Sequence, residues 1–179
     1  MIKKPILIIS GEPFSIFLEI FFKAIKLKKY KTPIIIITSK DLLIKQMKYL
    51  KYNFKINLLD KNEIKSKKLN NNSINIINVD FKFSKPFEKI SDRSNFYIEK
   101  CFKTGLEIIK KNLISGLING PISKKNFLKE EYLGITEYLA NKTKKTDKVA
   151  MLIYNKKLSV SPITTHLPLK LVSKNLSKN

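Results

Sequence analysis

The single histidine of the chain, His166, lies in the segment Thr-Thr-His-Leu-Pro at residues 164–168. The apolar run before it, residues 158–163, predicts a strand, so we expect His166 at a strand end, where α/β sheets bind ligands. Imidazole is the commonest metal ligand among side chains and carries protons near neutral pH. A lone histidine is more often an ordinary surface or core residue, and a catalytic metal needs about three protein ligands. A metal at His166 therefore requires carboxylates, another subunit or residues absent from this chain.

A second candidate site is the predicted helix start Gly134-Ile135-Thr136-Glu137. Glycine permits close backbone approach, and free N–H groups at a helix start bind phosphate or carboxylate. Thr136 could equally serve as a simple helix cap, with Glu137 in the first turn. The local pattern leaves both interpretations open.

Two turns that follow predicted strands complete the set of candidates. Gly11-Glu12-Pro13 follows the first strand, but the spaced glycines of a dinucleotide fingerprint are missing. Asn119-Gly120-Pro121 follows a later strand and leads to Lys124, which could meet an anion or simply be exposed. No Walker loop, Ser-His-Asp set or zinc-finger spacing is present.

The elements that must position these residues alternate between strands and helices. Short apolar runs predict strands, and 3.6-residue periodicity predicts helices; a polar loop is expected over residues 60–73. This alternation indicates an α/β fold with an at least partly parallel sheet. Strands are expected at 5–10, 33–38, 54–58, 74–79, 113–118, 149–154 and 158–163, and helices at 16–24, 39–50, 91–112, 124–130 and 136–144.

The formal charge of +22 first suggests nucleic acid, but its composition argues against a dedicated site. Of the 36 basic residues only Arg93 is an arginine, whereas specific readers of phosphate and bases rely on the forked guanidinium. The lysines are spread along the chain and fit A/T-biased coding, so we expect only weak, salt-sensitive binding to polyanions. The one cysteine, Cys101, suits a reducing cytosol and is expected to be a small core residue on a helix. The first apolar run is too short for a signal peptide or membrane span.

Four segments in order resemble the 4-hydroxythreonine-4-phosphate dehydrogenase family. The last of them, at residues 164–169, is the most specific, because it is similar to the family's metal-binding strand end. The match covers essentially this whole chain but about the first half of the family's length. The segments are Ser-Gly-Glu-Pro at 10–13, Gly-Leu-Ile-Asn-Gly-Pro-Ile-Ser-Lys at 116–124, Gly-Ile-Thr-Glu-Tyr-Leu-Ala at 134–140 and Thr-Thr-His-Leu-Pro-Leu at 164–169.

The resemblance implies a three-layer α/β/α fold like isocitrate and isopropylmalate dehydrogenases, incomplete because the C-terminal half is missing. It places a first domain at 1–134 and the start of a dimer-forming domain at 135–179. It implies a cytoplasmic homodimer that oxidises and decarboxylates 4-phosphohydroxy-L-threonine in pyridoxal 5′-phosphate (vitamin B6) biosynthesis, with NAD or NADP and a divalent metal (Zn, Mg or Co). His166 takes the place of the first of three metal histidines, and Thr136 that of a substrate-contacting threonine.

Ile135 stands where the family usually has a substrate-contacting histidine, and isoleucine donates no hydrogen bond. This favours a close rival, a dehydrogenase of a related four-carbon phosphorylated sugar acid. With one of three metal ligands, the chain alone is expected to be an inactive or incomplete fragment. A hypothesis from another class is a basic, non-catalytic nucleic-acid-binding protein, supported by the charge alone. No specific nucleic-acid partner and no membrane partner are expected under the dehydrogenase interpretation.

Overall fold

The computed structural model describes residues 4–65, 69–129, 131–146, 149–164 and 167–176. The chain divides into two compact units, Met1–Glu130 and Glu131–Asn179. In the described parts of the chain, every helix is too short or too polar to span a membrane.

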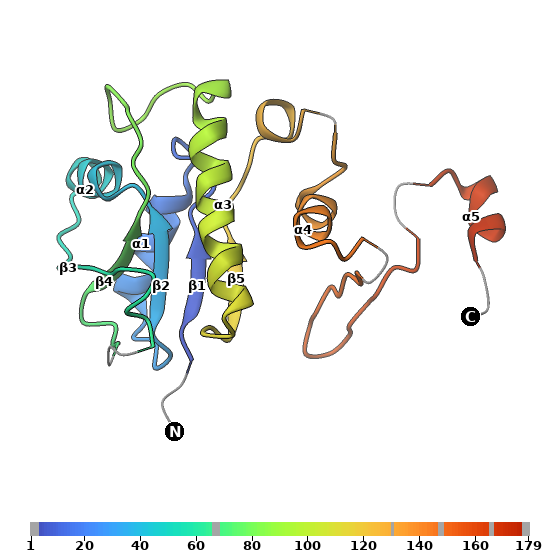
Figure 1. Ribbon diagram of the computed structural model, residues 1–179, viewed down its shortest axis with the longest axis horizontal. Coiled ribbons are helices and arrows are strands. Elements are labelled where there is room, and N and C mark those ends of the chain that lie inside the picture. The colour runs from blue at the N-terminus through green and yellow to red at the C-terminus, as the bar shows by residue number, and fades with distance from the viewer. Residues whose placement is uncertain (1–3, 66–68, 130, 147–148, 165–166, 177–179) are drawn as a thin grey trace. The chain divides into compact units, whose positions relative to one another are not determined.

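The first unit contains a five-stranded, wholly parallel sheet, which confirms the predicted α/β fold (Figure 1). The spatial order is β3-β4-β2-β1-β5, so the chain crosses from one side of β1 to the other between β4 and β5. Such a reversal of strand order is the point at which open α/β sheets bind ligands. The strands are β1 (Ile6–Ile9), β2 (Ile34–Thr38), β3 (Ile56–Leu58), β4 (Ile74–Asn78) and β5 (Gly116–Asn119).

Helices cover both faces of this sheet. Helices α1 (Phe17–Leu27) and α2 (Lys40–Tyr49) pack together on one face, where their apolar side chains join Ile8, Ile36 and Ile76 in one core cluster. Because side chains alternate along a strand, the neighbouring residues of the strands face the other way, toward α3 (Asn95–Lys110). Figure 1 shows α3 in front of the sheet and α1 behind it.

Two local features fix the positions of these helices. Ser39 caps α2 by accepting a hydrogen bond from the Leu42 amide, as its place before the helix predicts. On α3, a Cβ at Gly105 would lie 2.7 Å from Cδ1 of Ile9, so glycine lets the helix approach β1 closely. Cys101 is fully buried on the same helix, which confirms its expected place in the core.

The second unit is built differently from what its sequence predicts. It contains α4 (Ile135–Thr143) and the short helix α5 (Leu169–Asn175). The strands expected at 149–154 and 158–163 are wrong: their only described pairing is one antiparallel bridge between Ile153 and Val160. The side chains of both segments are largely exposed, and a lone two-stranded ribbon without an apolar face to pack on is marginal.

Candidate functional site

The two glycine turns meet at the carboxyl ends of β1 and β5. Gly11 has a φ of 72°, a left-handed conformation that favours glycine. A Cβ added at Gly11 would lie 2.3 Å from the carbonyl oxygen of Pro121, and one at Gly120 would lie 2.1 Å from that of Ser10. These glycines therefore allow one turn to approach the other. The space beside each glycine is filled by the backbone of the other turn and not left open for a ligand.

Backbone hydrogen bonds join the two turns. The Gly120 amide donates to the Ile9 carbonyl at 2.7 Å, and the Glu12 amide donates to the Pro121 carbonyl at 2.8 Å. The helical segment η2 (Lys124–Leu128) begins a few residues later, with Lys124 exposed at its start. Lys124 thus lies near the turn, as predicted, with its side chain exposed.

Glu12 is a buried carboxyl group at this edge, with 2 % of its surface exposed. The Ser94 hydroxyl donates to its Oε2 at 3.0 Å, while Oε1 has no hydrogen-bond partner among the described residues. Burial raises the pKa of Glu12 above its ordinary value, and the hydrogen bonds from Ser94 and from the Phe14 amide oppose that shift. Glu12 therefore holds a proton more tightly than an exposed glutamate does.

Tyr97 of α3 ties the ends of β1 and β2 together. Its hydroxyl lies 3.3 Å from Oγ of Ser10 and 3.2 Å from Oγ1 of Thr38, and it accepts a hydrogen bond from the Ser39 amide at 3.0 Å. Burial is the main cause that raises the pKa of Tyr97 far above its usual range, so the phenol is neutral at physiological pH. Its role is to satisfy buried polar groups.

Sequence reasoning identified the Gly11–Glu12 turn but missed Tyr97 and Ser94. A signal was present, since Tyr97 occupies a helix position adjacent to the apolar Ile98 while Ser10 and Thr38 end two buried strands. A phenol at such a place usually finds a hydrogen-bond partner. Which strand end it would reach depends on where α3 crosses the sheet.

In the second unit, Ile135 and Thr136 are the first two residues of α4, and both are half-buried. The N-cap is Gly134, which has an extended backbone and no side chain to cap the helix. Thr136 is therefore inside the helix, and the interpretation of Thr136 as a simple cap is wrong. Gly134 gives the first amides of α4 no side-chain cap, and the Glu137 carboxylate lies near Gly134 at the same helix start.

His166 lies outside the described residues, so its assignment as a metal ligand stays a prediction. The segment before it is not a strand, which removes the strand-end argument for that assignment. Among the described residues there is no group of three His, Cys, Asp or Glu side chains that could hold a metal. These residues by themselves do not fit a catalytic divalent metal, which needs about three ligands from the protein. The described residues also give no support for a dinucleotide site at the Gly11 turn, since its backbone is packed against the turn at Gly120 and Pro121.

Comparisons with known proteins identify the family of this chain and show solved structures with the same fold. The family model described as pyridoxal phosphate biosynthetic protein PdxA matches residues 29–179. The chain belongs to this PdxA family. A 4-hydroxythreonine-4-phosphate dehydrogenase from Sulfurihydrogenibium sp. (strain YO3AOP1) is 35% identical over 175 residues, covering 94% of this chain and 51% of that protein.

Solved structures of 4-hydroxythreonine-4-phosphate dehydrogenases share the fold of this PdxA-family chain. The 4-hydroxythreonine-4-phosphate dehydrogenase of Klebsiella pneumoniae aligns with a TM-score of 0.77 at 23% identity, covering 97% of this chain and 55% of that chain. The enzyme of that name from Burkholderia phymatum aligns with a TM-score of 0.74 at 21% identity, covering 93% of this chain and 51% of that chain. The chain thus spans about half the length of the relatives that it matches.

Proposed function

We propose that this chain supplies part of the active site of an NAD(P)-dependent, metal-assisted 4-hydroxythreonine-4-phosphate dehydrogenase. The observation that carries the proposal is the 35% identity to a protein of that name over 175 residues, nearly the whole chain. In this proposal the substrate is 4-phosphohydroxy-L-threonine, and the reaction is oxidation of its hydroxyl with loss of carbon dioxide, in pyridoxal 5′-phosphate synthesis.

Thr136 is the proposed substrate contact. Its position in the first turn of α4 places a hydroxyl beside the first amides of the helix, which the N-cap residue Gly134 leaves without a side-chain cap, so one anionic group could accept hydrogen bonds from both. His166 is the proposed metal ligand, and the remaining ligands must come from outside the described residues. We propose a cytoplasmic homodimer as the working form, as the resemblance to the dehydrogenase family implies.

The substrate contact can be tested by an NMR titration of the 179-residue chain with 4-phosphohydroxy-L-threonine. We expect saturable shifts of the Ile135 and Thr136 amides. Replacing Thr136 by valine should weaken binding about tenfold, because a lost hydrogen bond is worth about 1 kcal/mol and a bond to a charged group somewhat more. Thr146→Val, at an exposed position in the same unit, is the matched control and should leave binding unchanged. Shifts that avoid the start of α4 would contradict the assignment.

The metal proposal is tested by activity. With one of three ligands, the isolated chain should form no measurable NADH from substrate and a divalent metal, and robust turnover would overturn the three-ligand assignment. Sequencing the DNA beyond codon 179 gives an independent check. Further histidine codons in frame would support a metal site shared with additional sequence.

A related four-carbon phosphorylated sugar acid is the second candidate substrate. Ile135 favours it, because an apolar side chain stands where the resemblance implies a histidine donor to the substrate. Turnover of both substrates should be compared on a full-length relative carrying Gly-Ile-Thr-Glu, together with its Ile-to-His variant. Preference for the threonine phosphate in the parent protein, unchanged in the variant, would remove the argument for the sugar acid.

A further inference from the structure

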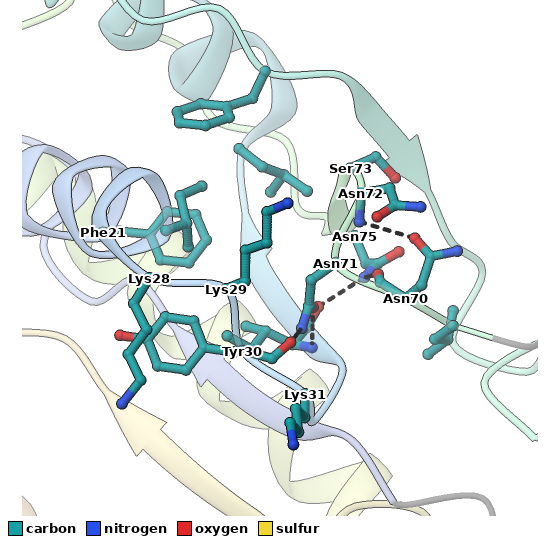
Figure 2. A pocket seen from close by; sticks show the side chains of 15 residues that line it. Phe21, Lys28, Lys29, Tyr30, Lys31, Asn70, Asn71, Asn72, Ser73 and Asn75 are labelled. Carbon is teal, nitrogen blue, oxygen red and sulfur yellow. Dashed lines mark hydrogen bonds between the residues drawn. The ribbon is translucent and has the colours of Figure 1, made fainter.

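A pocket of about 520 Å³ lies at the end of the sheet where the parallel strands begin, away from the glycine turns at their carboxyl ends. Figure 2 shows the side chains that line it. It lies between the end of α1, the segment 28–31, the loop 69–73 and the start of β4. Ile34 and Ile74, which begin β2 and β4, are among its lining residues. In a parallel sheet all strands begin at one end and finish at the other. This pocket is therefore separate from the candidate site at the carboxyl ends of β1 and β5.

The walls of the pocket are held together without a ligand. The Asn71 side chain accepts from the Ile34 amide at 2.9 Å and donates to the carbonyls of Tyr30 and Thr32 at 2.8 Å each. Buried Asn75 donates to the Ile34 carbonyl at 2.9 Å. These bonds fix the loop 69–73 and the start of β4 against the start of β2 and the segment before it, so the pocket is preformed, and Asn71 has little capacity left for a ligand.

The floor of the pocket is apolar and partly open. Phe21 and Ile25 come from α1, and Phe54 precedes β3. Phe21 is almost fully buried, while Ile25 and Phe54 are half-buried and so present carbon surface to the space. Burying apolar surface of a ligand against them would be favourable in proportion to the area covered.

The polar part of the pocket is cationic. Lys28, Lys29 and Lys31 line it, and no Asp or Glu is among its described lining residues. Figure 2 shows Lys29 extending into the space between α1 and the loop, whereas Lys28 and Lys31 point outward. The Lys28 ammonium group lies 5.7 Å from the centre of the Tyr30 ring, which leaves Lys29 as the cation best placed to meet a ligand.

We propose that this pocket binds a small amphipathic anion: an aromatic or alkyl body on Phe21, Ile25 and Phe54, with a phosphate or carboxylate at Lys29. A neutral apolar molecule would make no charge contact with the exposed Lys29 ammonium group. An inorganic anion would leave the apolar floor in contact with water. Only a ligand with both parts matches both surfaces. The proposal does not depend on the proposed dehydrogenase activity.

The test is an NMR titration of the 179-residue chain with phenyl phosphate, followed through the amides of Ile25, Asn72 and Ser73. Inorganic phosphate and benzyl alcohol are the two half-ligands. We expect saturable shifts at these amides with phenyl phosphate. Inorganic phosphate, which covers none of the apolar floor, should bind at least about tenfold more weakly. Benzyl alcohol, which lacks the charge contact, should bind about two- to fivefold more weakly.

The charge contact is tested by Lys29→Met against Lys45→Met, which removes an exposed lysine of α2. Lys29→Met should weaken phenyl phosphate binding about two- to fivefold, as expected for an exposed ion pair, and Lys45→Met should not change it. Lys29→Gln, a second exposed substitution, repeats the measurement with a polar side chain. Equal weakening by the Lys29 and Lys45 variants, equal affinity for inorganic phosphate, or no saturation at the pocket amides would each overturn the proposal.

Discussion

The contact between the two glycine turns predicts a large loss of stability on Gly120→Ala. The new Cβ would lie 2.1 Å from the Ser10 carbonyl oxygen, 2.7 Å from its carbon and 3.0 Å from Cγ of Phe17. Two of these atoms are backbone, and ordinary contacts begin near 3.4 Å, so the turns must separate by about 1 Å. That movement also strains the hydrogen bond from the Gly120 amide to the Ile9 carbonyl.

The magnitude follows from these two effects. Overpacking in a tight contact costs about 1–3 kcal/mol, and a weakened backbone hydrogen bond adds about 1 kcal/mol. We therefore expect Gly120→Ala to lower the free energy of unfolding by about 2–4 kcal/mol, a large part of the 5–15 kcal/mol typical of a domain.

The measurement is urea unfolding of the 179-residue chain, followed by circular dichroism. Gly116→Ala is the matched control, because a Cβ there meets nothing within 4 Å although Gly116 begins β5, the strand that ends just before Gly120. Its stability should stay within about 0.5 kcal/mol of the parent. If Gly120→Ala were as stable as Gly116→Ala, the packed-turn account of these glycines would be refuted.

Four further predictions test the rest of the structure. Tyr97→Phe should lower the free energy of unfolding by about 1–3 kcal/mol, because the buried Ser39 amide loses its acceptor; an unchanged urea midpoint would contradict the hydrogen-bond network. Glu12 binds its proton more tightly when folded, so the parent's stability should fall as pH rises from about 4.5, the ordinary value, through the raised pKa. The neutral variant Glu12→Gln should lose less stability over that pH range, and parallel curves would show that Glu12 does not titrate as inferred. Burial raises the pKa of Cys101 to about 12, so a thiol reagent should modify it only after unfolding, and rapid reaction of the native chain would place it elsewhere. Binding to random-sequence DNA should be lost at moderate salt, and nanomolar affinity at physiological salt in a filter-binding titration would favour a nucleic-acid function.

The order and type of elements in the first unit were predictable from local patterns. Buried parallel strands appear as continuous apolar runs, and Ser39 before an amphipathic stretch indicates a capped helix. Both features depend on residues close together in the chain. The resemblance of four short segments also led to the correct family, since the order and spacing of motifs are properties of the sequence alone.

The second unit shows where local patterns fail. Residues 149–154 and 158–163 have apolar content typical of strands, yet they form one bridge with most side chains exposed. Strand formation needs a partner edge and a surface on which to bury one face, and the described part of this unit offers neither. The place of Thr136 inside α4, with Gly134 as the cap, likewise depended on where the helix begins.

By itself, the sequence determined the strand and helix segments of the first unit, the cap on α2 and the buried cysteine, because these follow from periodicity and side-chain chemistry over a few residues. Only the tertiary structure decided that the two glycine turns pack against each other, that Tyr97 reaches both strand ends, and that Glu12 is buried beside Ser94. It also determined that a pocket forms beside Lys29. Each of these brings together residues far apart in the chain, and their separation in space is set by how helices cross the sheet, which no local pattern encodes.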